Sequence, residues 1–183
     1  MTRKGKIYSP MKFTLAALVL LFLSSLICKA QYNEDVVKAA YIERITRFVE
    51  WPLRDSLLSH DQFVIGVYNE DEFFSTLSEV FKDKTIKGLL VKIIPVKNTK
   101  EIGACNLCYI SEKARSSIKD FISAANSSGV LLISGTIGFC KAGVHINFYL
   151  EDEKLKFEIN EKSLASGGFK VSYLLLQNTR IIQ

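Results

Sequence analysis

The seven residues Gln62–Tyr68, QFVIGVY, decide the fold class of this chain. Phe63–Val67 is an unbroken apolar run, which is typical of a strand buried on both faces of a parallel sheet. The next residues, NEDE at 69–72, indicate a helix start with Asn69 as its N-cap and an acid three positions later. The helix then carries apolar side chains at helical spacing: Phe73, Phe74, Leu77, Val80 and Phe81. A buried strand that leads directly into an amphipathic helix predicts an α/β protein.

Further strands and helices alternate along the rest of the chain. The expected strands are Leu89–Pro95, Leu107–Ile110, Val130–Ser134, Val144–Leu150 and Leu155–Ile159. The last two form an antiparallel hairpin, because the link between them is too short for a crossover. Ser111 and Asn160 are expected to cap two helices, and Val171–Ile182 is expected to be the last helix. We therefore predict an α/β three-layer sandwich with a mostly parallel, Rossmann-like sheet and an antiparallel edge hairpin.

The first thirty residues are typical of an export signal. Basic residues come first, no acid precedes Glu34, and Phe13–Ile27 is an uncharged, leucine-rich run. The small residue Ala30 stands at the expected cut, and the run falls short of the ~20 residues that a membrane-spanning helix needs. We expect a cleaved signal peptide at 1–30 and a single exported domain at 31–183. A retained anchor and lipid attachment at Cys28 are the alternatives.

Cleavage of this signal would change the charge balance of the protein. The chain has 24 Lys and Arg residues, of which five lie in residues 1–30, and 19 acidic residues, none of which does. The remaining 19 basic residues therefore balance the 19 acidic ones. A balanced charge gives no electrostatic support for binding nucleic acid.

No motif in the sequence predicts catalysis or a cofactor. There is no glycine-rich phosphate loop, and the stretch Ser134–Gly138 lacks the central serine of a nucleophile elbow. His60 lies in a polar stretch, and His145 lies early in a predicted strand, where a structural histidine is expected. The sequence motifs therefore predict no catalytic residue, no metal and no cofactor.

Three cysteines, Cys105, Cys108 and Cys140, are the candidates for a disulfide or for redox chemistry. Cys105 and Cys108 form a CxxC that leads into a strand, whereas redox enzymes place this motif at a helix start. Three positions apart on a strand, the two side chains should face opposite ways and be unable to bridge. The same argument opposes a zinc site made with Cys140 and His145. Cys108 is expected to fill the core, and Cys105 and Cys140 are the better candidates for a bridge.

The stretch at 38–52, KAAYIERITRFVEWP, predicts an amphipathic helix that Pro52 ends, with Trp51 as a packing anchor. It also resembles the N-terminal signature of the YfiR-like periplasmic regulators. Five later segments resemble the same family in the same order: Phe63–Val67, Cys105–Ser111, Val130–Ser134, Ile146–Asn160 and Gly168–Leu175. The resemblance covers nearly all of residues 36–182.

This resemblance implies a periplasmic regulator that contacts the extracytoplasmic part of an inner-membrane signalling protein. The implied partner is a diguanylate cyclase, which makes cyclic di-GMP, or a sensor histidine kinase, and the implied effect is repression without turnover. A homodimer is also expected from the family. A periplasmic small-molecule sensor, with its ligand at the carboxyl ends of the parallel strands, is the alternative. A thiol oxidoreductase is the third hypothesis.

The cysteine pattern departs from that of the family members with two disulfides. Those proteins have a cysteine near the first strand and a second one soon after the position of Cys140. Residues 63–75 and 141–152 contain no cysteine in this chain. Each family bridge therefore lacks one partner, and a Cys105–Cys140 disulfide would be a rearrangement.

Overall fold

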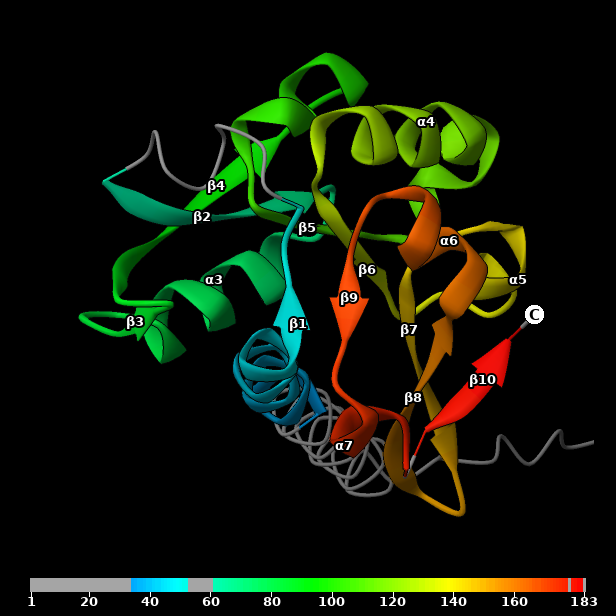
Figure 1. Ribbon diagram of the computed structural model, residues 1–183. Helices are drawn as coiled ribbons and strands as arrows, with labels where there is room; N and C mark the ends of the chain where they lie inside the picture. Colours follow the sequence, from blue (N-terminus) through cyan, green and yellow to red (C-terminus); the bar gives the residue numbers. More distant parts are fainter. Residues whose placement is uncertain (1–33, 53–60, 178, 183) are drawn as a thin grey trace, which may run out of the picture. The chain divides into compact units, whose positions relative to one another are not determined.

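The computed structural model describes residues 34–52, 61–177 and 179–182 (Figure 1). The predicted signal peptide at 1–30 and His60 lie outside these residues. Among the residues described, none of the helices has the length and apolar character that a membrane crossing requires.

An eight-stranded sheet forms the centre of the domain, with the strand order β10-β8-β7-β6-β5-β2-β4-β3. The strands are β2 Gln62–Tyr68, β3 Thr85–Ile86, β4 Leu89–Val96, β5 Leu107–Ile110, β6 Leu131–Ser134, β7 Ile146–Glu151, β8 Lys154–Asn160 and β10 Arg180–Ile182. β4, β2, β5, β6 and β7 are parallel to one another, whereas β3 and β8 run antiparallel to their neighbours β4 and β7. The prediction of a mostly parallel sheet with an antiparallel hairpin is confirmed, although β10 lies outside β8 and forms the edge.

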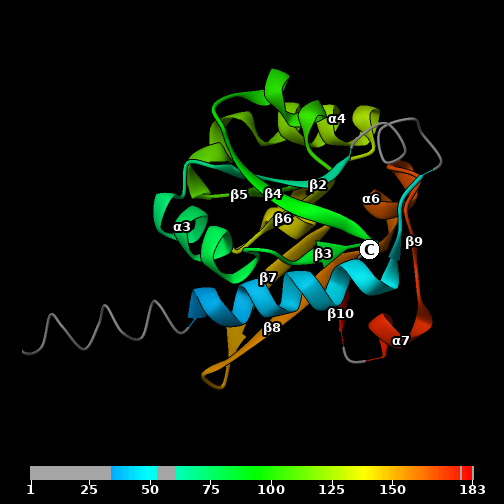
Figure 2. The same ribbon diagram turned by 90° about the vertical axis from the view of Figure 1, so that its left-hand side faces the viewer.

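Alternate residues of the central strands pack into two separate apolar cores. Phe63, Ile65 and Val67 of β2 enter the first core, and Val64 enters the second. The first core is covered by the helix at 34–48, α3 (Asp71–Val80), α6 (Glu161–Ser166) and α7 (Tyr173–Leu176). The second is covered by the 3-10 helices η1 (Thr99–Ala104) and η2 (Glu112–Ser117), α4 (Ile118–Ser128) and α5 (Phe139–Ala142). Figures 1 and 2 show the helix at 34–48 and α4 on opposite faces of the sheet, which confirms the three-layer sandwich.

The first described helix ends earlier than predicted. It stops at Phe48, and β1 (Val49–Glu50) pairs antiparallel with β9 (Lys170–Val171). The Phe48 carbonyl accepts a hydrogen bond from the backbone N–H of Ser172 instead of continuing the helix. A tertiary strand pairing therefore ends the helix before Pro52 can.

The predicted last helix over Val171–Ile182 is wrong. This segment contains the end of β9, the four-residue helix α7, and β10. The Ser172 side chain caps α7 by accepting a hydrogen bond from the Leu174 N–H at 3.3 Å. β10 then pairs parallel with β8, with Ile181 opposite Ile159. Apolar residues suit either element, and the free edge of β8 selects the strand.

Two of the three predicted helix caps differ from the structure. Asn69 lies in the left-handed region with φ 51°, and Glu70 takes the N-cap position of α3 without a side-chain bond. Ser111 precedes a 3-10 helix and makes no capping bond. The prediction that Asn160 caps a helix is confirmed, since its Oδ1 accepts a hydrogen bond from the Ser163 N–H at 2.8 Å.

Asn106, just before β5, joins four segments of the chain. Its backbone N–H donates to the Val64 carbonyl at 2.8 Å, and its side-chain Oδ1 accepts the Val64 N–H at 2.7 Å. Its carbonyl accepts both the Trp51 indole N–H at 2.9 Å and the Leu131 N–H at 3.0 Å. Trp51 also packs edge-on against the Phe63 ring with centroids 5.5 Å apart, so its role as a packing anchor is confirmed.

Replacing Asn106 should destabilise the domain. In Asn106→Ala the buried Val64 N–H loses its side-chain acceptor, and we expect the free energy of unfolding to fall by about 1–3 kcal/mol. Chemical denaturation followed by Trp51 fluorescence measures this loss. The matched control is Asn98→Ala at the exposed N-cap of η1, where water can replace part of the lost hydrogen bonding and a smaller loss is expected. Equal losses in the two variants would contradict the role given to Asn106.

Candidate functional site

A groove of about 230 Å³, lined mainly by aromatic and aliphatic residues, lies between the helix at 34–48, β8 and α7. We call it the α7 groove, and its lining residues are Tyr41, Arg44, Ile45, Phe48, Phe157, Leu174 and Leu175. The Tyr41 ring packs edge-on against Phe157 at 5.5 Å, and its hydroxyl donates to the Leu155 carbonyl at 3.3 Å. These contacts hold the floor of the groove in place.

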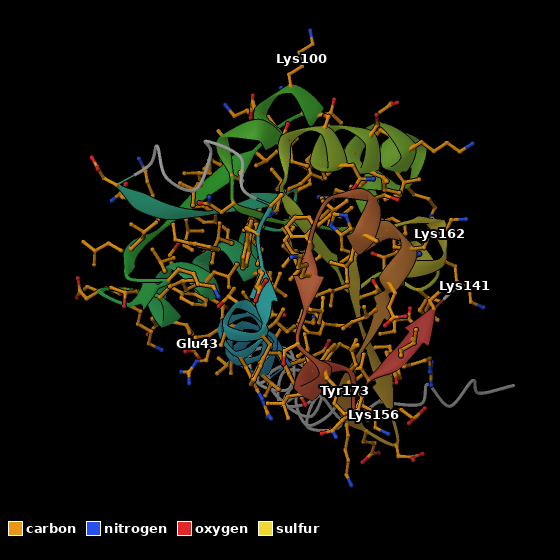
Figure 3. The ribbon with its side chains drawn as sticks, in the orientation of Figure 1. Glu43, Lys100, Lys141, Lys156, Lys162 and Tyr173 are labelled. Atoms are coloured by element: carbon orange, nitrogen blue, oxygen red, sulfur yellow. The ribbon has the colours of Figure 1, made fainter. Side chains whose placement is uncertain are left out.

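The rim of the α7 groove exposes two large apolar side chains. Because α7 has four residues, it buries Leu175 and leaves Tyr173 73 % exposed and Leu174 64 % exposed. Figure 3 labels Tyr173 beside α7. Ile181 of β10 and Leu150 of the β7–β8 hairpin are also exposed apolar residues, at 42 % and 58 %. Neighbouring exposed apolar side chains such as Tyr173 and Leu174 are typical of a protein-binding surface.

Glu151 of the β7–β8 hairpin is ion-paired, whereas Arg44 of the α7 groove is not paired with any described residue. Glu151 forms ion pairs with Lys156 and with Arg180, the latter at 2.6 Å. The hydrogen bond from Lys156 is the main reason why the pKa of the Glu151 carboxyl is lowered. Arg44, on the groove itself, is exposed and makes no ion pair with any other described residue. It therefore offers a guanidinium to an incoming carboxylate beside the apolar surface.

The structure brings Cys105 and Cys108 together. A β-carbon added to Gly66 of β2 would lie 2.5 Å from the Cys105 Sγ and 3.4 Å from the Cys108 Sγ. Both thiols are free and buried in the second core. A hydrogen bond with Cys105 and burial raise the pKa of the Cys108 thiol well above its ordinary value. The prediction that these side chains face opposite ways is wrong, because the chain bends at Asn106.

Cys140 lies in α5, next to the end of β8. Its carbonyl accepts the side-chain N–H of Asn160 at the end of β8, and β6 and β7 separate β8 from β5. Neighbouring strands are ~4.8 Å apart, whereas bridged cysteines need Cα atoms within ~7 Å. Burial raises the pKa of the Cys140 thiol to about 12. The structure therefore does not bring Cys105 and Cys140 together, and the described residues hold no cluster of three or more acidic, His or Cys side chains suited to a metal.

His145 is a buried structural residue, as predicted. Its Nδ1 accepts the Leu132 backbone N–H at 2.9 Å, and its Nε2 lies 2.8 Å from Asn126 Oδ1. The ring is therefore the neutral tautomer with its proton on Nε2. Burial lowers the pKa of His145 to about 3. The imidazole also packs against Phe169, with ring centroids 5.1 Å apart.

Polar groups gather at the carboxyl ends of β2, β5 and β6. The buried Lys38 amine donates to Asp35 at 3.2 Å, and both groups act on the partly buried Glu70. Burial, followed by repulsion from Asp35, raises the pKa of the Glu70 carboxyl. The Ser111 hydroxyl is also buried and has no hydrogen-bond partner among the described residues. Sequence reasoning missed Lys38 as a polar site residue, although it opens the KAAY signature.

These strands have the order of a doubly wound α/β fold. β4, β2, β5, β6 and β7 follow the pattern 2-1-3-4-5, so the connections from β2 and from β4 leave on opposite sides. Such a switch point is where open α/β sheets commonly bind ligands. A pocket of about 330 Å³ lies beside it, at the carboxyl ends of β2 and β4, and is lined by Val67, Asn69, Glu70, Asp71, Phe74, Pro95, Val96 and Lys97.

Residues 35–180 match the YfiR/HmsC-like protein family. The chain belongs to this family. The match begins with the helix that carries the KAAY signature and ends within β10, so it spans the described domain. No curated protein matches the sequence.

Three solved structures are similar to parts of this chain at low sequence identity. A conserved domain protein from Vibrio cholerae O1 biovar eltor has 11 % identity and a TM-score of 0.51, over 70 % of this chain and 57 % of that one. An ABC domain in complex with L-Trp from Streptococcus pneumonia has 15 % identity and a TM-score of 0.49, over 66 % and 55 %. A ligand-free, open substrate-binding protein with adhesive properties from Clostridium difficile has 14 % identity and a TM-score of 0.49, over 66 % and 54 %. The chain thus spans little more than half the length of each neighbour.

The buried imidazole predicts a specific dependence of stability on pH. His145 has a pKa of about 3 when folded and about 6.5 when unfolded, so the unfolded chain binds more protons between these values. Its contribution to stability is complete above pH 6.5 and is lost as the pH falls. We expect a loss of about 2 kcal/mol between pH 7.5 and pH 5. Denaturation of wild type and His145→Gln at several pH values measures it, and the same slope in both proteins would contradict this assignment.

Proposed function

We propose that this YfiR/HmsC-like protein is a periplasmic regulator that binds the extracytoplasmic part of an inner-membrane signalling protein. The partner is a diguanylate cyclase or a sensor histidine kinase, and binding keeps it inactive. The family match supports the regulatory role. The predicted export signal supports the location, and the partner class follows from the family resemblance.

The α7 groove is the observation that carries this proposal. Tyr173 and Leu174 extend from a short helix whose other side is packed into the core, so a partner can cover them without unfolding the domain. Covering one large apolar side chain contributes about 1.5–3 kcal/mol. Arg44 adds a charged group at the edge of the same surface. We expect the partner to present apolar side chains next to a carboxylate.

Such a protein regulates by differential affinity. It must bind the inactive state of its partner more tightly than the active state, since equal affinity would shift nothing. A preference of about 2–3 kcal/mol is a typical coupling energy between two sites. One or two well-covered apolar side chains supply binding energy of this size. The proposed mechanism therefore needs no chemical turnover.

A small-molecule sensor is the second candidate function. The buried Ser111 hydroxyl, which has no hydrogen-bond partner in the described part of the chain, favours it, together with the Lys38, Asp35 and Glu70 cluster at the switch point. A polar ligand could complete the hydrogen bonding of Ser111 and contact the charged groups. This function is compatible with regulation, because ligand binding could be its input.

The docking hypothesis predicts that Leu174→Asp releases the partner. The purified periplasmic domain of the partner cyclase or kinase should bind the variant about 10–100-fold more weakly. Calorimetry measures the dissociation constant, and cyclic di-GMP or kinase output in cells measures repression.

The matched control is Leu90→Asp on β4, because Leu90 is similarly exposed, at 53 %, and does not line the α7 groove. Both variants should keep the wild-type unfolding temperature, since each leucine is mostly in water. Wild-type affinity in Leu174→Asp, or equal loss in Leu90→Asp, would reject the α7 groove as the docking site.

The sensor hypothesis predicts a thermal shift in a screen of nucleotides and amino acids. A ligand at 100 times its dissociation constant adds about 2.7 kcal/mol, which corresponds to roughly 5–10 °C for a domain of this size. Ser111→Ala and Lys38→Met should remove the shift, and the exposed control Lys92→Met should keep it. If no compound shifts the wild type, the sensor function is abandoned and the docking hypothesis still stands.

A further inference from the structure

Gly66 of β2 has no side chain, and the sulfur atoms of Cys105 and Cys108 lie next to the position that its β-carbon would occupy. It pairs with Cys108 in the register of β2 and β5, and the point where its β-carbon would lie is 2.5 Å from the Cys105 Sγ. The same point is 3.4 Å from the Cys108 Sγ. Any other residue type at position 66 would displace a sulfur, so the glycine is what lets both thiols enter this space.

We propose that Cys105 and Cys108 are a disulfide-forming pair, with Gly66 as the residue that makes room for the bridge. The inference goes beyond the regulatory function and does not depend on the membrane partner. It replaces the expected pairing of Cys105 with Cys140.

The local backbone explains how a CxxC next to a strand brings its sulfurs together. β5 begins at Leu107, so Cys105 lies before the strand and Asn106 forms a bend between them. The bend breaks the alternation of side chains that a continuous strand would impose. Both cysteines consequently enter the same apolar core, next to Val64 and Val96.

Asn106 holds one side of this arrangement in place. Its hydrogen bonds to both the N–H and the carbonyl of Val64 fix the position where the chain bends. Cys105 is held by one described backbone bond, from its N–H to the Ile102 carbonyl at 3.0 Å, and it takes part in no strand pairing. Cys105 is therefore the partner that can move to reach the bonding distance of about 2.05 Å.

The reaction is an exchange with an external disulfide such as oxidised glutathione. One cysteine thiolate attacks the glutathione disulfide, forms a mixed disulfide and releases one glutathione thiolate. The second cysteine then attacks the protein sulfur of the mixed disulfide and releases the second glutathione. The two protons lost by Cys105 and Cys108 leave with the two glutathione molecules. The two cysteines are oxidised, and the glutathione disulfide is reduced.

Burial determines when this exchange can occur. Cys105 is 3 % exposed and Cys108 is fully buried, so an oxidant reaches them poorly in the folded domain. The bridge should form while the chain folds in an oxidising compartment, or during local opening of the segment before β5. Cys140 is buried elsewhere and should remain a thiol.

The experiment counts and maps thiols in the exported full-length chain. The protein is secreted to the periplasm, denatured in guanidinium with N-ethylmaleimide and without reductant, and weighed by mass spectrometry. We expect one maleimide, on Cys140, in the mature wild type and three after reduction. Trypsin should release residues 101–113 as one peptide that contains both Cys105 and Cys108. This peptide should be unlabelled and lighter by two hydrogen atoms before reduction.

Variants test the pairing. Cys140→Ser should take up no maleimide before reduction and two after it, whereas Cys108→Ser should take up two before reduction. Two maleimides on unreduced Cys140→Ser would overturn the proposal, as would a Cys105–Cys140 bridge in wild type. Refolding reduced Cys140→Ser with and without oxidised glutathione gives a second readout that does not require Cys105 or Cys108 variants to fold. Labelled 101–113 peptide after refolding with oxidised glutathione would also overturn the proposal.

Discussion

The structure depends on the buried hydrogen bonds of Asn106. A strand buried on both faces cannot use water to satisfy its backbone, so each end needs an internal partner. Asn106 is the hydrogen-bond partner of the Val64 backbone in β2, and its own carbonyl accepts hydrogen bonds from the Trp51 indole and the Leu131 N–H. One residue thereby joins the N-terminal segment, β2, β5 and β6. The helix at 34–48 is positioned by the same residue, because Trp51 follows it closely.

The two faces of the sheet have different chemistry. The first core supports the helix at 34–48 and α7, whose exposed side chains Tyr173 and Leu174 form the proposed docking surface. The second core contains the thiols of Cys105 and Cys108. Asn106 follows Cys105 in the chain, and its carbonyl accepts a hydrogen bond from Trp51. A covalent change at Cys105 would therefore act next to Asn106, which contacts both faces of the sheet.

The central part of the fold could be predicted from local pattern. Apolar runs predicted β2, β4, β5 and β6, and the short acidic link predicted the β7–β8 hairpin, because these signals depend on the residues of each element. The end of the chain could not be predicted in this way. Leu174, Leu175, Ile181 and Ile182 fit a helix stripe or a strand equally well, and the choice depended on the free edge of β8. The sequence also cannot separate the exposed side chains of the proposed docking surface from core residues, because Leu174 and Leu175 have the same apolar character and only Leu175 is buried.

The sequence by itself determined the α/β class, the order of the central elements, the family signature and the structural role of His145. Each of these is encoded in composition and spacing over a few neighbouring residues. Only the tertiary structure decided that Cys105 lies beside Cys108 and far from Cys140, and that Tyr173 and Leu174 are exposed. Such facts depend on a bend at Asn106, a missing side chain at Gly66 and a strand edge filled by β10. Contacts between distant segments, rather than local propensity, determine each of them.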